Sequence, residues 1–415
     1  MENVKIEDCV RKLSSGFARS QKIYDAVHGF IRFNELERML IDSEPFQRLH
    51  HIHQLGIAFI VYPGATHTRF EHSLGAMELA TQIFERIASK NFSIPDRDYW
   101  LQIIRFAALC HDLGHLPFSH DAEKALLGKA GHEEWTRRAI LSDHCIPIWT
   151  RVQEYFPGKE VANDVLKMAI GEKKLIEMGE PLSFSPVERV LSQVVTGDFF
   201  GADRIDYLLR DAQCTGVSYG LFDYHQLIEM LCILSFEEEL QLGIEENGIE
   251  SCEALLLARH FMHQRVYQYS SVKAYKFHLA RFMKIHFEGK NVLDSLEGYL
   301  SLTDSEILVA LRKAAKDPAA LGHADADALM RREKRFKAVC VKEGIGEHLG
   351  IPEGAFYLEL NPQKESKGLS FPVLKRSGAV VPAGECSQIS IPTSSNHIVY
   401  VAPEYEKVVQ EVSQK

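Results

Sequence analysis

The sequence predicts a mainly α-helical fold with small β elements, and three observations support this prediction. Apolar residues recur at helical spacing from about residue 35 to about residue 335. Hydrophobic residues make up 46% of the 415 residues, which is enough for a large buried core in two or three domains. Beyond Gly344 the composition shifts to Pro, Gly, Ser and β-branched residues, which indicates a small strand-rich C-terminal region.

Two short β elements are expected within the helical part. Turn-forming residues around His28-Gly29, with apolar alternation after them, predict a small strand pair over residues 20–34. Further along, Asn247-Gly248 lies between two apolar stretches. This dipeptide is typical of a two-residue hairpin turn, so we expect a hairpin that protrudes from the helical body at this point.

The chain is expected to divide into three parts. Residues 1–20 are polar and predict an N-terminal tail. Helical patterns, apart from the short β elements, continue over residues 21–336, which we assign to one helical domain. Residues 337–415 form a small α+β region that ends in a short helix or tail.

Charge and cysteine content exclude several classes of protein. The formal net charge of -10 gives no electrostatic footprint for nucleic acid or an anionic membrane, and we expect neither as a partner. The eight cysteines are scattered without a C-x-x-C pair, as in reduced intracellular proteins. No apolar targeting core or membrane-length apolar run occurs, so a cytoplasmic location is expected.

A histidine followed directly by an aspartate is the most informative local feature. His111 and Asp112 come directly after the apolar helical segment 101–109. An imidazole nitrogen beside a carboxylate oxygen can bind one divalent metal, and the end of a buried helix fixes their geometry. His115 and His120 follow closely enough to act on a substrate at the same metal.

Two further segments carry charged residues at helical spacing. Arg69 and His72 are three residues apart at the start of an apolar helical segment, so they share a face. Asp203, Tyr207 and Asp211 share one face of a second helical segment. Burying so many charges without a metal or substrate would be unfavourable. The alternatives are a structural histidine in the first segment and a solvated, salt-bridged face in the second.

The order of these motifs resembles the H…HD…D signature of the HD-domain phosphohydrolases. The resemblance is closer to the deoxynucleoside triphosphate triphosphohydrolases (dNTPases), which include a vertebrate enzyme with SAM and HD domains and bacterial dGTPase-like enzymes. Four motifs carry it: RFEHSLG at 69–75, HDLGHLPFSH at 111–120, His132-Glu133, and DRIDYLLRD at 203–211. The resemblance covers roughly residues 20–335 and implies an HD-domain helical fold.

The resemblance implies a metal site and a catalytic group. One divalent cation would be bound by His72, His111, Asp112 and Asp203. This shell of two nitrogens and two oxygens suits Mg, Mn or Fe, and it also accepts Zn or Ni. The implied catalytic residues are His132, His115, His120, Glu123 and Glu133. Imidazole suits proton transfer because its ordinary pKa is near neutrality, although a helix-capping or core role is the alternative for His120.

A substrate site is implied as well. The substrate-binding positions would be Gln54, Leu55, Arg69, Arg204, Tyr207, Asp211, Arg259 and Tyr267. Arginine forks bind phosphate oxygens bidentately, and Arg259, His263 and Tyr267 are expected on one helical face. Gln54-Leu55, with Tyr207 and Asp211, would form a sugar pocket that has no room for a 2′-hydroxyl.

The resemblance also implies regulation by an activating nucleotide in a homodimer or homotetramer. The corresponding positions are Lys22, Asp42, Gln47 and His50. The vertebrate enzyme has a guanine-reading arginine where this chain has His50, and a histidine offers fewer donors. Alternatively, the segment that contains Asp42 and Gln47 is an ordinary capped helix start.

The leading hypothesis is therefore metal-dependent hydrolysis of a deoxynucleoside triphosphate (dNTP) to a deoxynucleoside and inorganic triphosphate. An HD phosphohydrolase that acts on a deoxynucleoside monophosphate or a cyclic nucleotide is the nearer alternative. A non-catalytic nucleotide sensor is the alternative of a different class. The presence of every implied metal ligand favours an enzyme over a sensor.

Overall fold

The computed structural model describes residues 18–90, 94–128, 131–341, 350–352, 354–360, 369–387, 389, 391 and 397–414. Most of the expected N-terminal tail, residues 1–17, lies outside them. The helices are α2 (Glu35–Ile41), α3 (Glu44–Gln47), α4 (Arg69–Ser89), α5 (Arg97–Cys110), α6 (Glu123–Leu126), α7 (Gly131–Ile140), α8 (Ile146–Tyr155), α9 (Val161–Ile170), α10 (Glu172–Glu177), α11 (Pro186–Thr196), α12 (Ala202–Thr215), α13 (Tyr224–Met230), α14 (Ile249–Met262), α15 (Ser270–Phe287), α16 (Leu296–Leu300), α17 (Asp304–Lys316), α18 (His323–Met330) and α19 (Glu406–Gln414). The strands are β1 (Gln21–Asp25), β2 (Gly29–Phe33), β3 (Leu231–Phe236), β4 (Glu239–Glu245), β5 (Lys337–Val341), β6 (Phe356–Leu360), β7 (Pro372–Leu374), β8 (Val380–Pro382) and β9 (His397–Val401).

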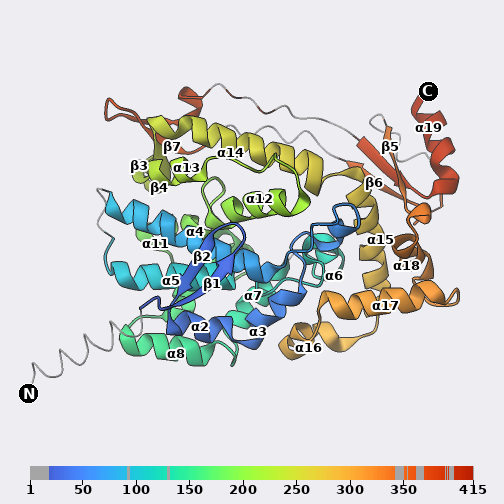
Figure 1. Cartoon of the computed structure of the whole chain (residues 1–415), viewed down its shortest axis with the longest axis horizontal. Coiled ribbons are helices and arrows are strands. Elements are labelled where there is room, and N and C mark those ends of the chain that lie inside the picture. Colours follow the sequence, from blue (N-terminus) through green and yellow to red (C-terminus); the bar gives the residue numbers. More distant parts are fainter. Residues whose placement is uncertain are drawn as a thin grey trace, which may run out of the picture.

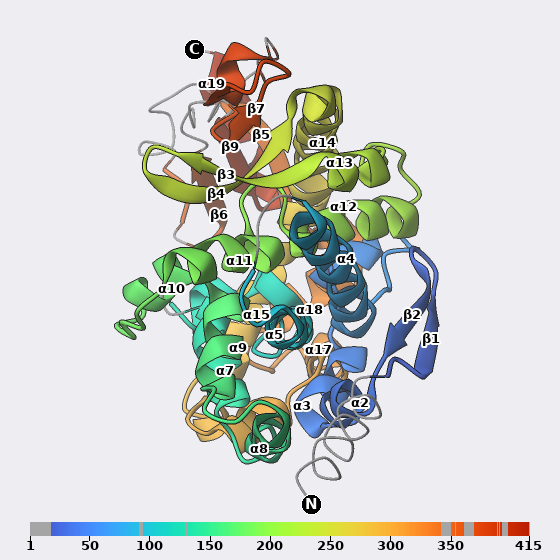
Figure 2. The same ribbon diagram turned by 90° about the vertical axis from the view of Figure 1, so that its left-hand side faces the viewer.

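The molecule is mainly helical, as the sequence predicts, and α4 and α5 lie side by side in the left-hand part of the view in Figure 1. Both helices pack against neighbours on several sides, α5 on α9 and α4 on α12, and Figure 2 shows α5 in the middle of the helical body. The side chains of Ile83, Phe84, Ile103 and Phe106 are fully buried there. Because the core lies between these helices, the residues at their ends are held rigidly. None of the described helices combines the length and apolar character needed to cross a membrane.

The N-terminal strand pair is confirmed and is fixed to the helical body by a buried ion pair. Strands β1 and β2 are antiparallel, with Asp25 opposite Gly29. The Arg105 guanidinium in α5 donates to both carboxylate oxygens of Glu37 in α2 and to the Arg32 carbonyl oxygen. A buried charge pair with these additional hydrogen bonds restricts how α2 and the hairpin can sit on α5.

The predicted hairpin turn at Asn247-Gly248 is wrong. Strands β3 and β4 do form an antiparallel hairpin, but its turn is at Glu237 and Glu238, whose φ angles are 50° and 66°. Asn247-Gly248 instead lies in a 3₁₀ turn, Glu246–Gly248, directly before α14. Asn-Gly suits any tight turn, and here the apolar residues that follow it repeat at helical spacing, so the chain enters a helix.

The strand-rich C-terminal region divides between two sheets. Strands β5, β9 and β6 form one antiparallel sheet, against which α19 packs. The short strand β7 instead pairs in parallel with β4, and β8 pairs with β7 (Figure 1). Part of the C-terminal region therefore extends the β3–β4 hairpin of the helical part, while the boundary at residues 336 and 337 stays a prediction.

Candidate functional site

Three helices bring the four predicted metal ligands together. His72 lies in the first turn of α4, His111 and Asp112 directly follow α5, and Asp203 lies in the first turn of α12. His72, His111 and Asp112 are buried, whereas the Asp203 side chain is 35% exposed. The centre formed by the four residues is thus buried at His72, His111 and Asp112 and accessible to solvent beside Asp203.

The donor atoms of His72, His111 and Asp112 converge at the spacing that one ion requires, and Asp203 lies beside the two histidines. His72 Nε2 lies 3.2 Å from His111 Nε2 and 3.0 Å from Asp203 Oδ1. Asp112 Oδ2 lies 3.5 Å from His72 Nε2, and its Oδ1 lies 3.4 Å from His111 Nε2. Adjacent ligands of a divalent cation, each about 2.1 Å from it, are about 3 Å apart. We refer to these four residues as the metal centre.

The tautomers of the two histidines identify the converging groups as acceptors. His111 Nδ1 lies 2.7 Å from the Ala108 carbonyl oxygen, which can only accept, so Nδ1 carries the hydrogen. His72 Nδ1 in the same way donates to Asp206 Oδ2 at 2.7 Å. In the neutral imidazoles both Nε2 atoms therefore present lone pairs to each other and to carboxylate oxygens. This arrangement fits a divalent cation, and such outer hydrogen bonds are typical of metal-binding histidines.

Asp206 is a buried carboxylate that supports the metal centre and that the sequence predictions left out. Besides His72, it accepts from His28 Nε2 at 2.6 Å and from Arg210 Nε at 2.9 Å. Burial raises the pKa of Asp206, but Arg210 and the two histidines hold that pKa well below its usual range. A Cβ atom at Gly75 would lie 1.9 Å from Asp206 Oδ1, so glycine permits this close approach of α4 and α12. The sequence signal that could have identified Asp206 is its position within the DRIDYLLRD motif at 203–211.

Arg69 contacts a metal ligand. Its Nη1 donates to Asp112 Oδ2 at 2.7 Å, and its Nε donates to Ser119 Oγ at 3.0 Å. Phe118 and Ser119 both have left-handed backbone conformations, with φ of 60° and 56°, and Asp304 accepts from the Phe118 amide at 2.6 Å. Left-handed non-glycine residues are unfavourable and are concentrated at functional sites. Arg69 thus orients Asp112 and this loop, which leads directly to His120.

The predicted catalytic histidines gather around one carboxylate. Glu123 Oε1 accepts from His132 Nδ1 at 2.8 Å, and its Oε2 accepts from His120 Nδ1 at 2.5 Å. The His115 ring stacks on the His132 ring at 3.8 Å, and His115 Nε2 lies 3.2 Å from Asp112 Oδ1. Burial raises the pKa of Glu123, but the hydrogen bonds from His120 and His132 hold that pKa below its usual range. We refer to His115, His120, Glu123 and His132, for which the family resemblance predicts proton transfer, as the proton-transfer group.

The proposed sugar-pocket residues meet at Asp211. Its Oδ1 lies 2.8 Å from His67 Nε2, and its Oδ2 accepts from the Tyr267 hydroxyl at 2.8 Å. The Tyr267 ring lies edge-on to the Tyr207 ring, with 6.1 Å between centroids. Gln54 Oε1 is buried and makes no hydrogen bond within the described part of the chain, which leaves it available to a ligand. The neighbour of Gln54, Leu55, packs against the main core.

Two arginines lie side by side near this pocket. Burial and the neighbouring Arg204 guanidinium lower the pKa of Arg259, as expected for close like charges. Arg204 Nη2 lies 3.5 Å from Asp198 Oδ1, whereas its buried Nε and Nη1 contact no acceptor among the described residues. The expectation that Arg259, His263 and Tyr267 share one helical face is wrong in part. Helix α14 ends at Met262, and a π-helical turn, His263–Tyr267, follows it. Such π turns occur frequently at functional sites.

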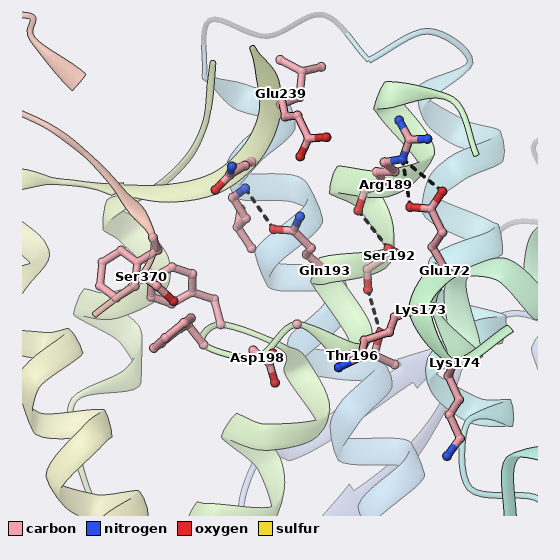
Figure 3. Close-up of a pocket in the computed structure, with 18 of the residues that line it drawn as sticks. Glu172, Lys173, Lys174, Arg189, Ser192, Gln193, Thr196, Asp198, Glu239 and Ser370 are labelled. Atoms are coloured by element: carbon pink, nitrogen blue, oxygen red, sulfur yellow. Dashed lines mark hydrogen bonds and ion pairs between the residues drawn. The ribbon is translucent and has the colours of Figure 1, made fainter. Parts of the chain in front are cut away.

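A cavity of about 640 Å³ lies near the site but is separate from it (Figure 3). Residues of α10, α11 and β4 line it, together with Phe371 before β7. None of the predicted site residues lines it, although Lys174 on its wall pairs with Glu133 at 3.2 Å and Asp198 contacts Arg204. Glu133 lies 3.7 Å from His132 Nδ1, but it also pairs with Lys174, which is outside the proton-transfer group.

The four residues of the predicted allosteric segment, which we call the regulatory group, are all exposed. Each contacts a nearby residue: Lys22 lies over the Phe30 ring, Asp42 pairs with Arg38, Gln47 donates to the Ile41 carbonyl oxygen, and His50 stacks on Phe70. No contact between two members of the group occurs in the described structure. In one copy of the chain they form a surface rather than a pocket.

This helical fold with a His/Asp centre defines the class of HD-type metal-dependent hydrolases. Residues 69–188 match the HD domain, and residues 222–389 match the HD associated region. The chain belongs to the HD-domain phosphohydrolase family, which confirms the resemblance drawn from its motifs.

Relatives with known sequences and structures support this assignment. YwfO of Bacillus subtilis, which is uncharacterised, is 31% identical over 71% of this chain and 66% of its own. The human deoxynucleoside triphosphate triphosphohydrolase SAMHD1 is 28% identical over 76% of this chain and 55% of its own. The chain spans about half to two thirds of the length of the curated relatives that it matches.

Two crystal structures resemble nearly the whole chain. A hypothetical protein from Aquifex aeolicus is 30% identical, with a TM-score of 0.78 over 94% of this chain and 99% of its own. A phosphohydrolase from Bacteroides thetaiotaomicron is 26% identical, with a TM-score of 0.71 over 92% and 99% of the two chains.

Proposed function

We propose that this protein is a metal-dependent dNTP triphosphohydrolase, which releases a deoxynucleoside and inorganic triphosphate. The observation that carries the proposal is the position of Arg204 along α12. It follows the metal ligand Asp203 directly and precedes Tyr207 and Asp211 of the sugar pocket by about one and two helical turns. One helix thus presents a metal ligand, a phosphate-binding arginine and sugar-pocket residues in succession. The similarity to SAMHD1 supports the same substrate class.

The arginine pair favours a polyphosphate over a monophosphate. Burial lowers the pKa of Arg259, and repulsion from the Arg204 guanidinium lowers it further. An anion with several charged oxygens between them would remove this repulsion and accept bidentate hydrogen bonds. A monophosphate bound at the metal centre has too few oxygens to serve both arginines as well.

Hydrolysis at the α-phosphorus requires one proton transfer to the leaving group. A water oxygen forms the new bond to phosphorus, the bond from phosphorus to the sugar 5′-oxygen breaks, and that oxygen takes up a proton. His72, His111, Asp112 and Asp203 would hold a divalent cation, which would supply Lewis acidity for the phosphoryl group. His120 and His132 both use Nδ1 to donate to Glu123, so each presents Nε2 for the proton transfer.

The sugar pocket accounts for a preference for deoxynucleotides. The rings of Tyr207 and Tyr267 lie edge to face, and Leu55 packs against the same core, so these side chains would give the pocket an apolar and aromatic wall. A 2′-hydroxyl placed against such a wall loses its water without gaining a partner, which costs binding energy. We expect kcat/KM for GTP to be about 10- to 100-fold lower than for dGTP.

Incubation of the purified protein with each dNTP and a panel of divalent metals tests the proposal. Chromatography of the products should show deoxynucleoside and intact triphosphate in equal amounts. The variant with His111→Ala and Asp112→Ala serves as the control for contaminating phosphatases. Stepwise release of single phosphates, or turnover only of a deoxynucleoside monophosphate or a cyclic nucleotide, would contradict the proposal.

A further inference from the structure

A buried histidine outside the predicted site connects the two sides of the proposed sugar pocket. The His67 carbonyl oxygen accepts a hydrogen bond from the Gln54 backbone N–H at 3.0 Å. The His67 ring Nε2 lies 2.8 Å from Asp211 Oδ1. Gln54 and Asp211 are far apart in the sequence, and His67 is only 4% exposed. His67 therefore joins the backbone at Gln54 to the Asp211 carboxylate.

The ring of His67 also determines how the Asp211 carboxylate can bind a ligand. His67 and the Tyr267 hydroxyl each occupy one carboxylate oxygen. A carboxylate oxygen has two acceptor sites, so each oxygen keeps one for a ligand. Burial lowers the pKa of His67, but the interactions with Asp211 and Cys214 outweigh it and raise that pKa to about 9. The ring is then an imidazolium at neutral pH, and its Nε2 donates to Asp211 Oδ1.

We propose that His67 is a positioning residue that holds the Asp211 carboxylate for the 3′-hydroxyl of the substrate. The inference rests on the proposed function, since the 3′-hydroxyl is the only free sugar hydroxyl of a dNTP. A hydroxyl donates well to an ionised, fixed carboxylate, and such charge-assisted bonds are stronger than neutral ones. His67 does not touch the substrate in this account; it acts through Asp211.

Combining an enzyme variant with a substrate analogue tests the coupling. His67→Phe keeps a ring at this position but removes the donor to Asp211. For dGTP, we expect kcat/KM to fall about 10- to 100-fold, the effect of a hydrogen bond with a charged group. The loss should fall mainly on KM, because the hydroxyl is remote from the reacting phosphorus. For 2′,3′-dideoxy-GTP, which lacks the hydroxyl, we expect less than about a threefold change.

Two further variants separate positioning from folding. His67→Gln retains an uncharged donor and should recover part of the loss with dGTP. His278 forms a matched pair elsewhere, since it is buried and its Nδ1 lies 2.8 Å from Asp325 Oδ1. His278→Phe should therefore lower stability without changing the ratio of kcat/KM for the two substrates.

The possible outcomes distinguish the inference from the function on which it rests. Equal losses for dGTP and the dideoxy analogue in His67→Phe, with no recovery in His67→Gln, would overturn the positioning role while leaving the proposed function intact. Failure of the wild-type protein to hydrolyse any dNTP would overturn the proposed function, and the inference with it.

Discussion

The metal centre and the regulatory group differ in how completely one chain builds them. In the metal centre, residues from three helices meet, and the histidine Nε2 atoms face carboxylate oxygens at 3.0–3.5 Å. In the regulatory group, Gln47 donates to a nearby carbonyl oxygen and His50 stacks on Phe70, both at an exposed surface. The first arrangement is preorganised for a ligand, whereas the second needs another molecule to bring its members together.

This difference indicates where function should be robust and where it should depend on conditions. A preorganised centre binds its ion without reorganisation of the chain. The residues of the regulatory group are exposed and contact only nearby residues. Such a group would bind a ligand when a nucleotide or a second copy of the chain supplies further contacts. Substitutions in the metal centre should therefore have large effects, and substitutions in the regulatory group should have small ones.

Removal of the adjacent metal ligands should have the largest effect. Replacing both His111 and Asp112 with Ala removes two of the four donors, and we expect dNTP turnover to fall at least about 10³-fold. Circular dichroism should show an unchanged helical content, since both residues follow α5 rather than support its interior. Turnover at the wild-type rate in this variant would refute the assignment of the metal centre.

Substitutions in the proton-transfer group should lower the rate and preserve metal binding. His132→Gln removes the imidazole that we propose transfers the proton, and kcat should fall about 10²- to 10⁴-fold. Metal content, measured by mass spectrometry, should not change. Glu123→Gln should be more harmful than Glu133→Gln, because Glu123 lies 2.8 Å from His132 Nδ1 and Glu133 pairs with Lys174. The opposite order would contradict the assignment of Glu123 as the orienting carboxylate.

Asp206→Asn tests how far the centre depends on its outer hydrogen bonds. The variant weakens the acceptor for His72 Nδ1, and metal affinity should fall about 10- to 100-fold in a Mn²⁺ titration. Asp325→Asn is the matched control, because Asp325 is equally buried and pairs with His278. A similar loss of metal affinity in both variants would indicate general destabilisation instead of a specific role for Asp206.

The smallest effect is expected in the regulatory group. His50→Arg adds donors at the position where the sequence resemblance implies guanine recognition. If that surface binds an activating nucleotide, GTP should stimulate dATP hydrolysis by the variant about fivefold more than by the wild type. Identical stimulation of both proteins, or none, would argue that these residues only cap and pack the local helices.

Sequence patterns predicted the helical fold because it depends on local spacing. The adjacent pair His111-Asp112 suggested a metal, whereas the set of four ligands was implied by the resemblance to the HD-domain family and stays a prediction. The supporting contacts of Asp206 with His28, and of His67 with Asp211, were not predicted. They join segments far apart in the sequence, and only tertiary packing brings such segments together.

The same reasoning explains the errors. The Asn247-Gly248 dipeptide favours a tight turn in either context, and the choice between a hairpin and a helix entry depends on the strand that pairs with β4. One strand that pairs with β4 is β7, which lies more than a hundred residues later in the chain. The π-helical turn at His263–Tyr267 likewise has no local signal, since its residues fit an ordinary helix equally well.

Measuring Mn²⁺ binding to the metal-stripped protein tests the central claim most directly, because two groups of side chains among the described residues have suitable donor atoms. These groups are His72, His111 and Asp112 of the metal centre, and the proton-transfer group. Titration followed by electron paramagnetic resonance should show one tightly bound ion per chain. That ion should be lost in the His111→Ala, Asp112→Ala variant and kept in a His120→Ala, His132→Ala variant. Loss of the tight ion in the second variant and its retention in the first would contradict the account.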